Sequence, residues 1–197
     1  MGRTKAKTYS QPDDHTCGPA SLKTALEILG KQHYSLTTLI KLCKTTKNGT
    51  SVNYLIHAAN QLGLSVLAVQ WSTLRHLQSA LKHNSGSPRA VIVDYLYDLK
   101  PNQTPVEDSG HYAAVASFSA RNSRLILFDS ASGGKKSYSW KKFLNRWFDY
   151  DYRRTWYLRK KGYRLSKKWH NRLMLVLARQ TKHLPRFRNP YTRVYPA

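Results

Sequence analysis

The spacing of the apolar residues changes near residue 88 from a helical to a strand pattern, and this change limits the folds open to the chain. Before it, apolar residues recur every three or four positions, as in Leu22, Ala25, Leu26 and Leu29. That spacing marks one face of a helix. After it, short apolar runs such as 89–94 and 111–118 are typical of strands. Helices followed by an antiparallel meander place the chain in the α+β class.

The same patterns predict individual elements. Helices are expected from Cys17 to a stop at Gly30, over Leu36 to Cys43, after a Thr50 or Ser51 cap to Leu62, over Ser72 to Leu81, and over Trp140 to Phe148. Strands are expected over Ser65 to Gln70, Arg89 to Asp94, His111 to Phe118, Arg124 to Asp129 and Arg154 to Arg159. A last amphipathic helix is expected to carry Leu165, Trp169, Leu173, Val176 and Leu177, and the prolines after Leu184 argue against further regular structure.

The charge of the chain is distributed unevenly. The 197 residues carry a formal charge of +23, and after Asp151 there are 14 basic residues and no acidic one. We therefore divide the chain into a domain over residues 1–161 and a basic C-terminal extension over 162–197. The hydrophobic fraction of 41% suffices for a core. The longest apolar run, residues 173–178, is far shorter than the ~20 residues that span a bilayer, so no transmembrane segment is expected.

Three roles are open to the basic extension. Its aromatic residues are interleaved with lysines and arginines, which suits nucleic-acid backbones and stacked bases. The predicted amphipathic helix also suits an anionic membrane surface. A helix that docks on its own domain and turns a basic face outward would give the same pattern. We therefore predict nucleic acid or another anionic surface as a partner, with docking as the plainer alternative, and the sequence leaves the oligomeric state open.

Two features favour a reducing, cytoplasmic setting. The basic N-terminal residues are not followed by an apolar stretch, so we expect no secretory signal. The two cysteines, Cys17 and Cys43, do not form a disulfide framework.

Cys17 is the candidate nucleophile. It lies at the predicted first turn of a helix, where unpaired backbone N–H groups and the helix dipole stabilise a thiolate. The alternative is a small buried apolar residue, the usual place of a free cysteine. Cys43, on the apolar stripe of a predicted helix, is interpreted as such a core residue.

A nucleophilic cysteine needs a base, and the base needs a group that orients it. His111 is the candidate base, because it follows Gly110 and opens an apolar strand. Asp129 ends the next strand, and a buried carboxylate there needs a partner such as an imidazole. The two side chains share a face only if the turn near Arg121 has the right parity, which the sequence leaves open.

Gln11 and a small acidic cluster complete the candidates. Gln11 precedes Cys17 by six residues, and its amide could join the Cys17 N–H in binding an oxyanion. Asp13, Asp14 and His15 next to Cys17 look like metal ligands, but no second cluster completes a site, so we expect no metal and no cofactor.

Four segments carry a family resemblance. QPDDHTCGPASL, GHYAAV, LILFDSASGG and the segment Trp140 to Phe143 resemble the bacteriocin-processing cysteine peptidases, papain-like domains that cleave double-glycine leader peptides. The resemblance covers about residues 8–160. Thr16 and Ser21 depart from the family pattern, which often has an acidic residue and a cysteine at these positions, but neither change removes a catalytic group.

The resemblance implies a papain-like cysteine peptidase. Cys17 would be the nucleophile, His111 the general base and acid, Asp129 the residue that orients His111, and Gln11 an oxyanion donor. The implied reaction cleaves a peptide or protein substrate through an acyl-enzyme, with no cofactor, and the same groups could also serve acyl transfer. The alternative is a non-catalytic, peptidase-like binding module whose basic extension binds nucleic acid or another polyanion.

Overall fold

A seven-stranded antiparallel sheet forms the centre of the computed structural model, which describes residues 6–31, 33–82, 87–157 and 162–197. The strand order is β5-β4-β3-β2-β8-β1-β9. The strands are β1 (Ser65–Val69), β2 (Arg89–Leu96), β3 (Gly110–Ser119), β4 (Arg124–Asp129), β5 (Gly134–Ser139), β8 (Met174–Ala178) and β9 (Thr192–Tyr195). A separate two-stranded sheet consists of β6 (Phe148–Tyr157) and β7 (Gly162–Asn171).

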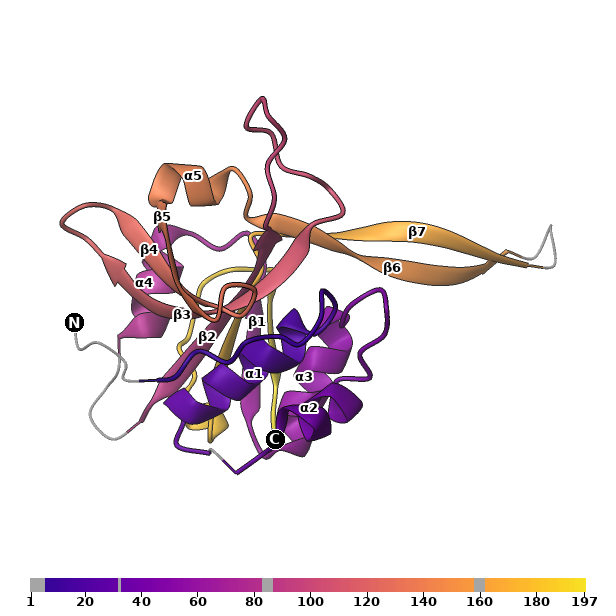
Figure 1. Cartoon of the computed structure of the whole chain (residues 1–197). Coiled ribbons are helices and arrows are strands. Elements are labelled where there is room, and N and C mark those ends of the chain that lie inside the picture. The colour runs from indigo at the N-terminus through magenta and orange to yellow at the C-terminus, as the bar shows by residue number, and fades with distance from the viewer. Residues whose placement is uncertain (1–5, 32, 83–86, 158–161) are drawn as a thin grey trace.

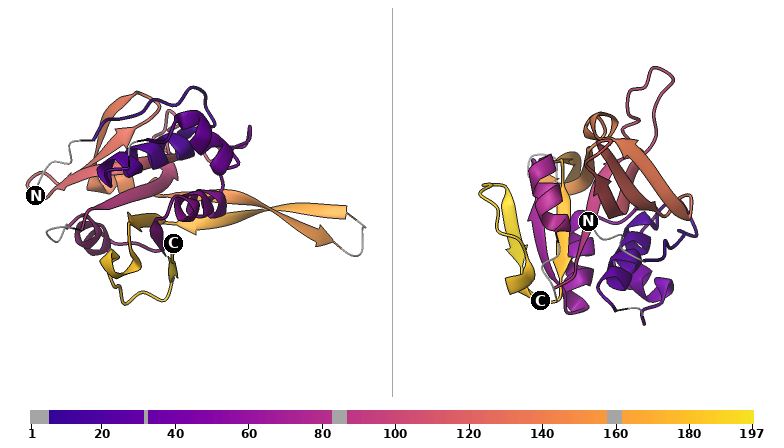
Figure 2. Two further views of the ribbon diagram at one scale, coloured as in Figure 1. Left: turned by 90° about the horizontal axis from the view of Figure 1, so that it is seen from below. Right: turned by 90° about the vertical axis from the view of Figure 1, so that its left-hand side faces the viewer.

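Helices cover both faces of the large sheet and give three layers (Figures 1 and 2). On one face lie α1 (Cys17–Ile28), α2 (Leu36–Leu42) and α3 (Val52–Gln61), and on the other lie α4 (Leu74–Leu81) and α5 (Trp140–Leu144). Strand β2 shows that both faces of the large sheet are covered by apolar side chains. Ile92 belongs to the apolar cluster under α1–α3, whereas Val91 and Val93 belong to the cluster under α4 and α5.

Most helices begin at the side-chain caps that the sequence contains. Ser35, Ser51, Thr73 and Ser139 each accept a hydrogen bond from a backbone N–H in the first turn of the following helix. The predicted helices that start at residues 17, 36 and 72, and the one capped at Ser51, are confirmed, as are the first four predicted strands. The α+β class is confirmed too. The helix expected over 140–148 ends at Leu144, and β6 begins at Phe148.

The amphipathic helix predicted in the C-terminal part is wrong. Residues 162–171 form β7 and residues 174–178 form β8, which lies between β2 and β1. The helical spacing gave a wrong prediction because β8 is apolar at every position and buried on both faces. A continuous apolar run fits the period of a helix as well as that of a strand. The segment after Leu184, expected to be irregular, contains β9 at the edge of the sheet.

The predicted boundary between a domain and an extension at residue 161 lies between two strands that are hydrogen-bonded to each other. Strands β6 and β7, on either side of it, pair along their whole length from Phe148 opposite Asn171 to Tyr157 opposite Gly162. The last two residues of the strand predicted over 154–159 lie outside the described residues. The β6–β7 hairpin extends far from the rest of the molecule (Figure 1).

Candidate active site

Cys17 is the first residue of α1 and lines a cleft. Unlike the other helices, α1 has no side-chain cap, since Thr16 accepts no hydrogen bond from its first turn. No N-cap side chain therefore competes for the N–H groups at this helix end, an arrangement that favours an anion.

A bulge in β3 decides the relation between His111 and Asp129. Strands β3 and β4 pair from Ser119 opposite Arg124 to Ser117 opposite Ile126, and the register then shifts, so that Val115 is opposite Leu127. The last pair in this register is Ala114 opposite Phe128, so the next position places Asp129 opposite Ala113. Ala113 is two residues from His111 on the same strand, and Asp129 therefore lies on the face that carries His111. Without the shift, Asp129 would lie opposite Ala114 and point to the other face.

His111 links the thiol to the carboxylate. Its Nε2 lies 3.2 Å from Asp129 Oδ1, which leaves Nδ1 as the ring nitrogen for the hydrogen bond with Cys17. Burial alone would lower the pKa of His111, but the hydrogen bonds to Asp129 and Cys17 outweigh it and raise this pKa to about 9. The imidazole is therefore charged at neutral pH and stands between two groups that favour its charge.

Asp129 is held by two further donors that the sequence analysis missed. Burial would raise its pKa, but hydrogen bonds from His111, from Ser132 Oγ at 2.8 Å and from Tyr97 Oη at 3.0 Å hold the pKa below its ordinary range. The Tyr97 ring also packs on the His111 ring, with centroids 4.7 Å apart. A serine three residues after the aspartate is a visible turn signal. Nothing in the sequence marks Tyr97, which the pairing of β2 with β3 brings into place.

Gln11 lies next to the end of β4. Its backbone N–H donates to the Ser130 carbonyl at 3.0 Å, and its Oε1 accepts from Ser130 Oγ at 2.8 Å. Its Nε2 donates one hydrogen to the Asp13 carbonyl at 2.8 Å. An amide NH₂ has two hydrogens, so one more remains for another acceptor. The structure thus ties Gln11 to the residue after Asp129, and Asp129 in turn contacts His111.

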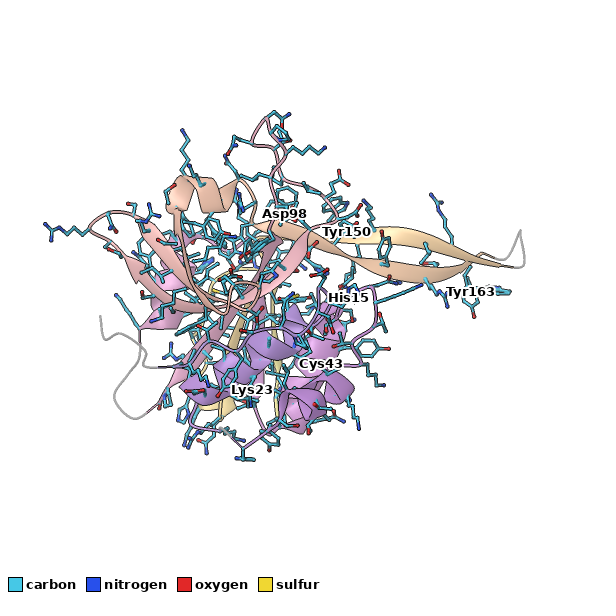
Figure 3. The ribbon with its side chains drawn as sticks, in the orientation of Figure 1. His15, Lys23, Cys43, Asp98, Tyr150 and Tyr163 are labelled. Carbon is cyan, nitrogen blue, oxygen red and sulfur yellow. The ribbon has the colours of Figure 1, made fainter. Side chains whose placement is uncertain are left out.

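The cleft beside Cys17 is acidic, although the chain is strongly basic. It has a volume of about 550 Å³ and is lined by five of the ten acidic residues of the chain: Asp14, Glu107, Asp108, Asp149 and Asp151. Lys44 and Lys47 are the lysines among its lining residues. His15 and Tyr150, which also line it, are labelled in Figure 3. The excess positive charge of the protein therefore lies elsewhere.

Asp94 and Asp149 form a buried carboxyl pair, and Asp149 lines the cleft. Burial first, and then the neighbouring Asp149, raise the pKa of Asp94 well above its usual value, while burial raises the pKa of Asp149 to about 6. The Asp149 carboxylate also packs against the backbone of Gly110, where an added Cβ would come within 2.7 Å of its Cγ. Glycine at this position lets the carboxylate approach the strand one residue before His111.

Cys43, unlike Cys17, does not line the cleft, although both cysteines are buried and belong to the apolar cluster under α1–α3. Cys43 is fully buried there, and burial raises its pKa to about 12. The interpretation of Cys43 as a core residue is confirmed. Both cysteines are free thiols.

Comparison with known proteins assigns the family. Residues 4–154 match the model of the Peptidase_C39 like family. The chain belongs to this family. A curated relative, an uncharacterized protein of Methanothermobacter marburgensis, is 32% identical over 123 residues, which are 62% of this chain and 70% of the relative. The predicted resemblance to double-glycine leader peptidases is thereby confirmed at the level of the family.

Two solved structures share the fold of this C39-like chain. The peptidase domain of Streptococcus ComA, a bifunctional ABC transporter of a quorum-sensing pathway, superposes with a TM-score of 0.62 at 23% identity and covers 89% of this chain and 99% of that domain. A double-glycine-motif protease from an AMS/PCAT transporter, in complex with its leader peptide, gives a TM-score of 0.57 at 15% identity and covers 90% and 94%. In the described part of this chain, no helix is long and apolar enough to cross a membrane.

Proposed function

We propose that this C39-like protein is a cysteine peptidase that cleaves a peptide or leader sequence through Cys17, His111 and Asp129. The observation that carries the proposal is the chain of contacts from the Cys17 thiol through His111 to Asp129, located at the edge of a cleft large enough for a peptide. The family and the fold of the two peptidase domains support the same reaction class.

In the proposed mechanism, the Cys17 sulfur attacks the scissile carbonyl, and the carbonyl oxygen becomes an oxyanion. The Cys17 N–H and the Gln11 amide stabilise this oxyanion. Protonated His111 gives its proton to the leaving amine, which departs and leaves an acyl-enzyme. Water, deprotonated by His111, then attacks the thioester and releases the carboxylic acid and the Cys17 thiol. An amine in place of this water would give acyl transfer.

The substrate class follows from the family and from the cleft. By analogy with the family, small residues precede the cleaved bond. The five acidic side chains that line the cleft favour substrates with cationic side chains near this bond. We therefore expect peptides with a double glycine followed by lysine to be cleaved faster than the same peptides with glutamate.

The test is peptide cleavage followed by mass spectrometry, with the full chain and three single-cysteine or histidine variants. Cys17→Ala and His111→Ala are expected to abolish cleavage. Cys43→Ala is the matched control, because it removes the other free thiol, which lies in the apolar core away from the cleft. Equal loss in Cys17→Ala and Cys43→Ala would point to the fold and not to the nucleophile.

Alkylation by iodoacetamide separates an inactive relative from an enzyme whose substrate was not in the peptide set. At about pH 7 we expect Cys17 to be modified and Cys43 to be protected, because the high pKa of Cys43 keeps it a thiol. His111→Ala should slow the modification of Cys17. If Cys17 reacts no faster than a free cysteine and His111→Ala changes nothing, the alternative of a non-catalytic, peptidase-like binding module holds.

A polyanion partner for the basic C-terminal residues is a second proposal. The 14 basic residues after Asp151 occur without any acidic residue, which favours nucleic acid or an anionic surface. A cytoplasmic location, where such partners and reduced thiols coexist, is proposed with it, and microscopy of a fluorescent fusion would test it.

A further inference from the structure

One face of the β6–β7 hairpin combines aromatic and basic side chains. The register pairs Tyr152 with Lys167, Arg154 with Leu165 and Trp156 with Tyr163. Because side chains alternate along a strand, these six residues share one face of the hairpin, which we call the hairpin face. Neighbouring positions along each strand of this face repeat at about 6.8 Å.

The outer part of the hairpin face is exposed away from the cleft, whereas Tyr152, at its inner end, lines the cleft. The exposed fractions are 54% for Tyr152, 50% for Trp156, 67% for Tyr163 and 60% for Leu165. Figure 3 shows Tyr163 near the far end of the hairpin, away from the layers of the body. Apolar side chains of this size seldom lie together in solvent unless they bind something.

The aromatic and basic groups of the face are already in contact. The Trp156 and Tyr163 rings meet edge to face, with centroids 5.0 Å apart, and the Arg154 guanidinium lies 5.9 Å from the centre of the Tyr163 ring. At the body end, Lys167 pairs with Glu107 at 2.8 Å. The distal part with Arg154, Trp156 and Tyr163 is thus the part that offers rings and positive charge to a ligand.

Beyond Asp151, the charged residues of the hairpin itself are all basic. Between residues 152 and 168 the chain has no acidic residue, and the described part of this stretch contains five basic ones, Arg153, Arg154, Arg164, Lys167 and Lys168. Arg153, Arg164 and Lys168 alternate with the hairpin face and lie on the opposite face. A ligand that bound the rings would therefore meet positive charge on the face itself and along both strands.

We propose that the distal part of the hairpin face binds single-stranded nucleic acid, with bases stacked on Trp156 and Tyr163 and phosphates next to Arg154 and the neighbouring cations. Flat aromatic side chains bind unpaired bases of any sequence, while duplex bases are stacked on one another and do not offer their faces. This inference rests on the proposed polyanion partner and assigns it a site. It does not depend on peptidase activity.

The alternation of charge on the face argues against insertion into a lipid bilayer. A membrane-inserting face is apolar, with its cations at the border. Here Arg154 stands between Tyr152 and Trp156 on the same strand and on the same face. Inserting the rings would remove the guanidinium from water without a partner, which is costly. Stacking on nucleic acid leaves it next to a phosphate.

The test is fluorescence anisotropy with labelled oligothymidylate and oligouridylate of about twenty nucleotides, which spans a typical single-strand site. The full chain should bind both more tightly than a duplex of the same length. The double variant Trp156→Ala, Tyr163→Ala should lose about fivefold or more in affinity, the loss expected when one stacked base is no longer supported. Binding should weaken steeply between about 50 and 200 mM salt.

A matched pair of charge variants tests the face itself. Arg154→Gln and Arg153→Gln remove the same charge from neighbouring exposed positions, but only Arg154 is on the hairpin face. We expect the first to weaken binding more than the second. The Cys17 alkylation rate serves as a control for the fold.

Other outcomes overturn the inference in distinguishable ways. Oligonucleotide binding that the double variant leaves unchanged would reject the site and keep the polyanion partner. Binding to vesicles with anionic lipid or to polyglutamate, without preference for oligonucleotides, would reject stacking on bases. No binding to any of these probes would reject both proposals and leave the peptidase proposal untouched.

Discussion

At the scale of single residues, the site depends on how His111 keeps its charge. The imidazole is buried, so its proton is retained only because Asp129 and Cys17 accept hydrogen bonds from it. Asp129 in turn stays ionised because Tyr97, Ser132 and His111 donate to it. A change at Tyr97 should therefore reach Cys17 through two intervening side chains, Asp129 and His111, although Tyr97 is not among the residues that line the cleft.

The raised pKa of His111 predicts an alkaline limit of activity. Because the leaving amine needs a proton from His111, kcat/KM should fall as pH rises through about 9, the pKa of this residue. Asp129→Asn removes a charge that raises this pKa, and the limit should move down by about one to three pH units. The exposed Asp98→Asn is the matched control. An alkaline limit that stays in place in Asp129→Asn would contradict the role given to this carboxylate.

The same pKa affects stability. The pKa of His111 is raised from 6.5 to about 9 on folding, so its contribution to the free energy of unfolding is complete below pH 6.5 and is lost as pH rises through 9. Stability from this residue should thus decline over the same range as activity.

At the scale of elements, three local features bring the groups together. The N-terminus of α1 presents Cys17, the bulge in β3 turns Asp129 to the side of His111, and Gly110 opens β3 where a larger residue would collide with Asp149. Asp149 cannot easily move aside, because the Tyr150 N–H donates to its Oδ1 at 2.8 Å and Asp94 lies next to it.

Gly110→Ala should therefore damage both stability and activity. The added methyl group would displace either Asp149 or the start of β3, at about 1–3 kcal/mol of the free energy of unfolding, and His111 is the next residue. Gly134→Ala is the matched control, since the nearest atom to its added Cβ is Ser132 Oγ at 3.8 Å. Urea unfolding and peptide cleavage measure the two effects. Equal, small changes in both variants would show that the Asp149 contact does not constrain the strand.

At the scale of the whole molecule, the C-terminal residues complete the sheet. Strand β8 hydrogen-bonds to β1 on one side and β2 on the other, and none of its five residues is more than 2% exposed. Charges of opposite sign also lie in different parts of the molecule. Acidic residues line the cleft, whereas basic residues lie along the hairpin strands. The two charged regions meet at Tyr152, which belongs to the hairpin and lines the cleft.

Two shortened chains should distinguish the contribution of the β6–β7 hairpin to stability from that of the C-terminal strands β8 and β9. A chain that ends at Asn171 lacks β8 and β9 and is expected to show no cooperative unfolding, because β1 and β2 lose their common neighbour. Replacement of residues 153–166 by Asn-Gly shortens the hairpin at the Tyr152–Lys167 pair and should leave the unfolding midpoint close to that of the full chain. Circular dichroism during thermal unfolding compares the two. A stable chain ending at Asn171 would show that the sheet does not need β8 and β9, as the predicted division at residue 161 requires.

Most helices and strands of the first 130 residues could be predicted, because their positions depend on local sequence signals. The caps at Ser35 and Ser51 and the apolar spacing of α1 act within a few residues. The candidates Cys17, His111 and Asp129 were found because each stands at the end of an apolar element. Strand β8 was missed because its apolar residues occur at every position, so that neither period is distinguishable until its neighbours in the sheet are known.

The sequence by itself determined the α+β order, the family and the four residues proposed for catalysis. Only the tertiary structure decided whether these residues meet. The register shift near Ala116 comes from the pairing of β3 with β4, and the position of Tyr97 from the pairing of β2 with β3. It also decided that the basic C-terminal part supplies a central strand and one strand of an exposed hairpin, and not a helix. The spacing of apolar residues shows which side chains will be buried. Which strands become neighbours in the sheet depends on how the whole molecule buries its apolar surface.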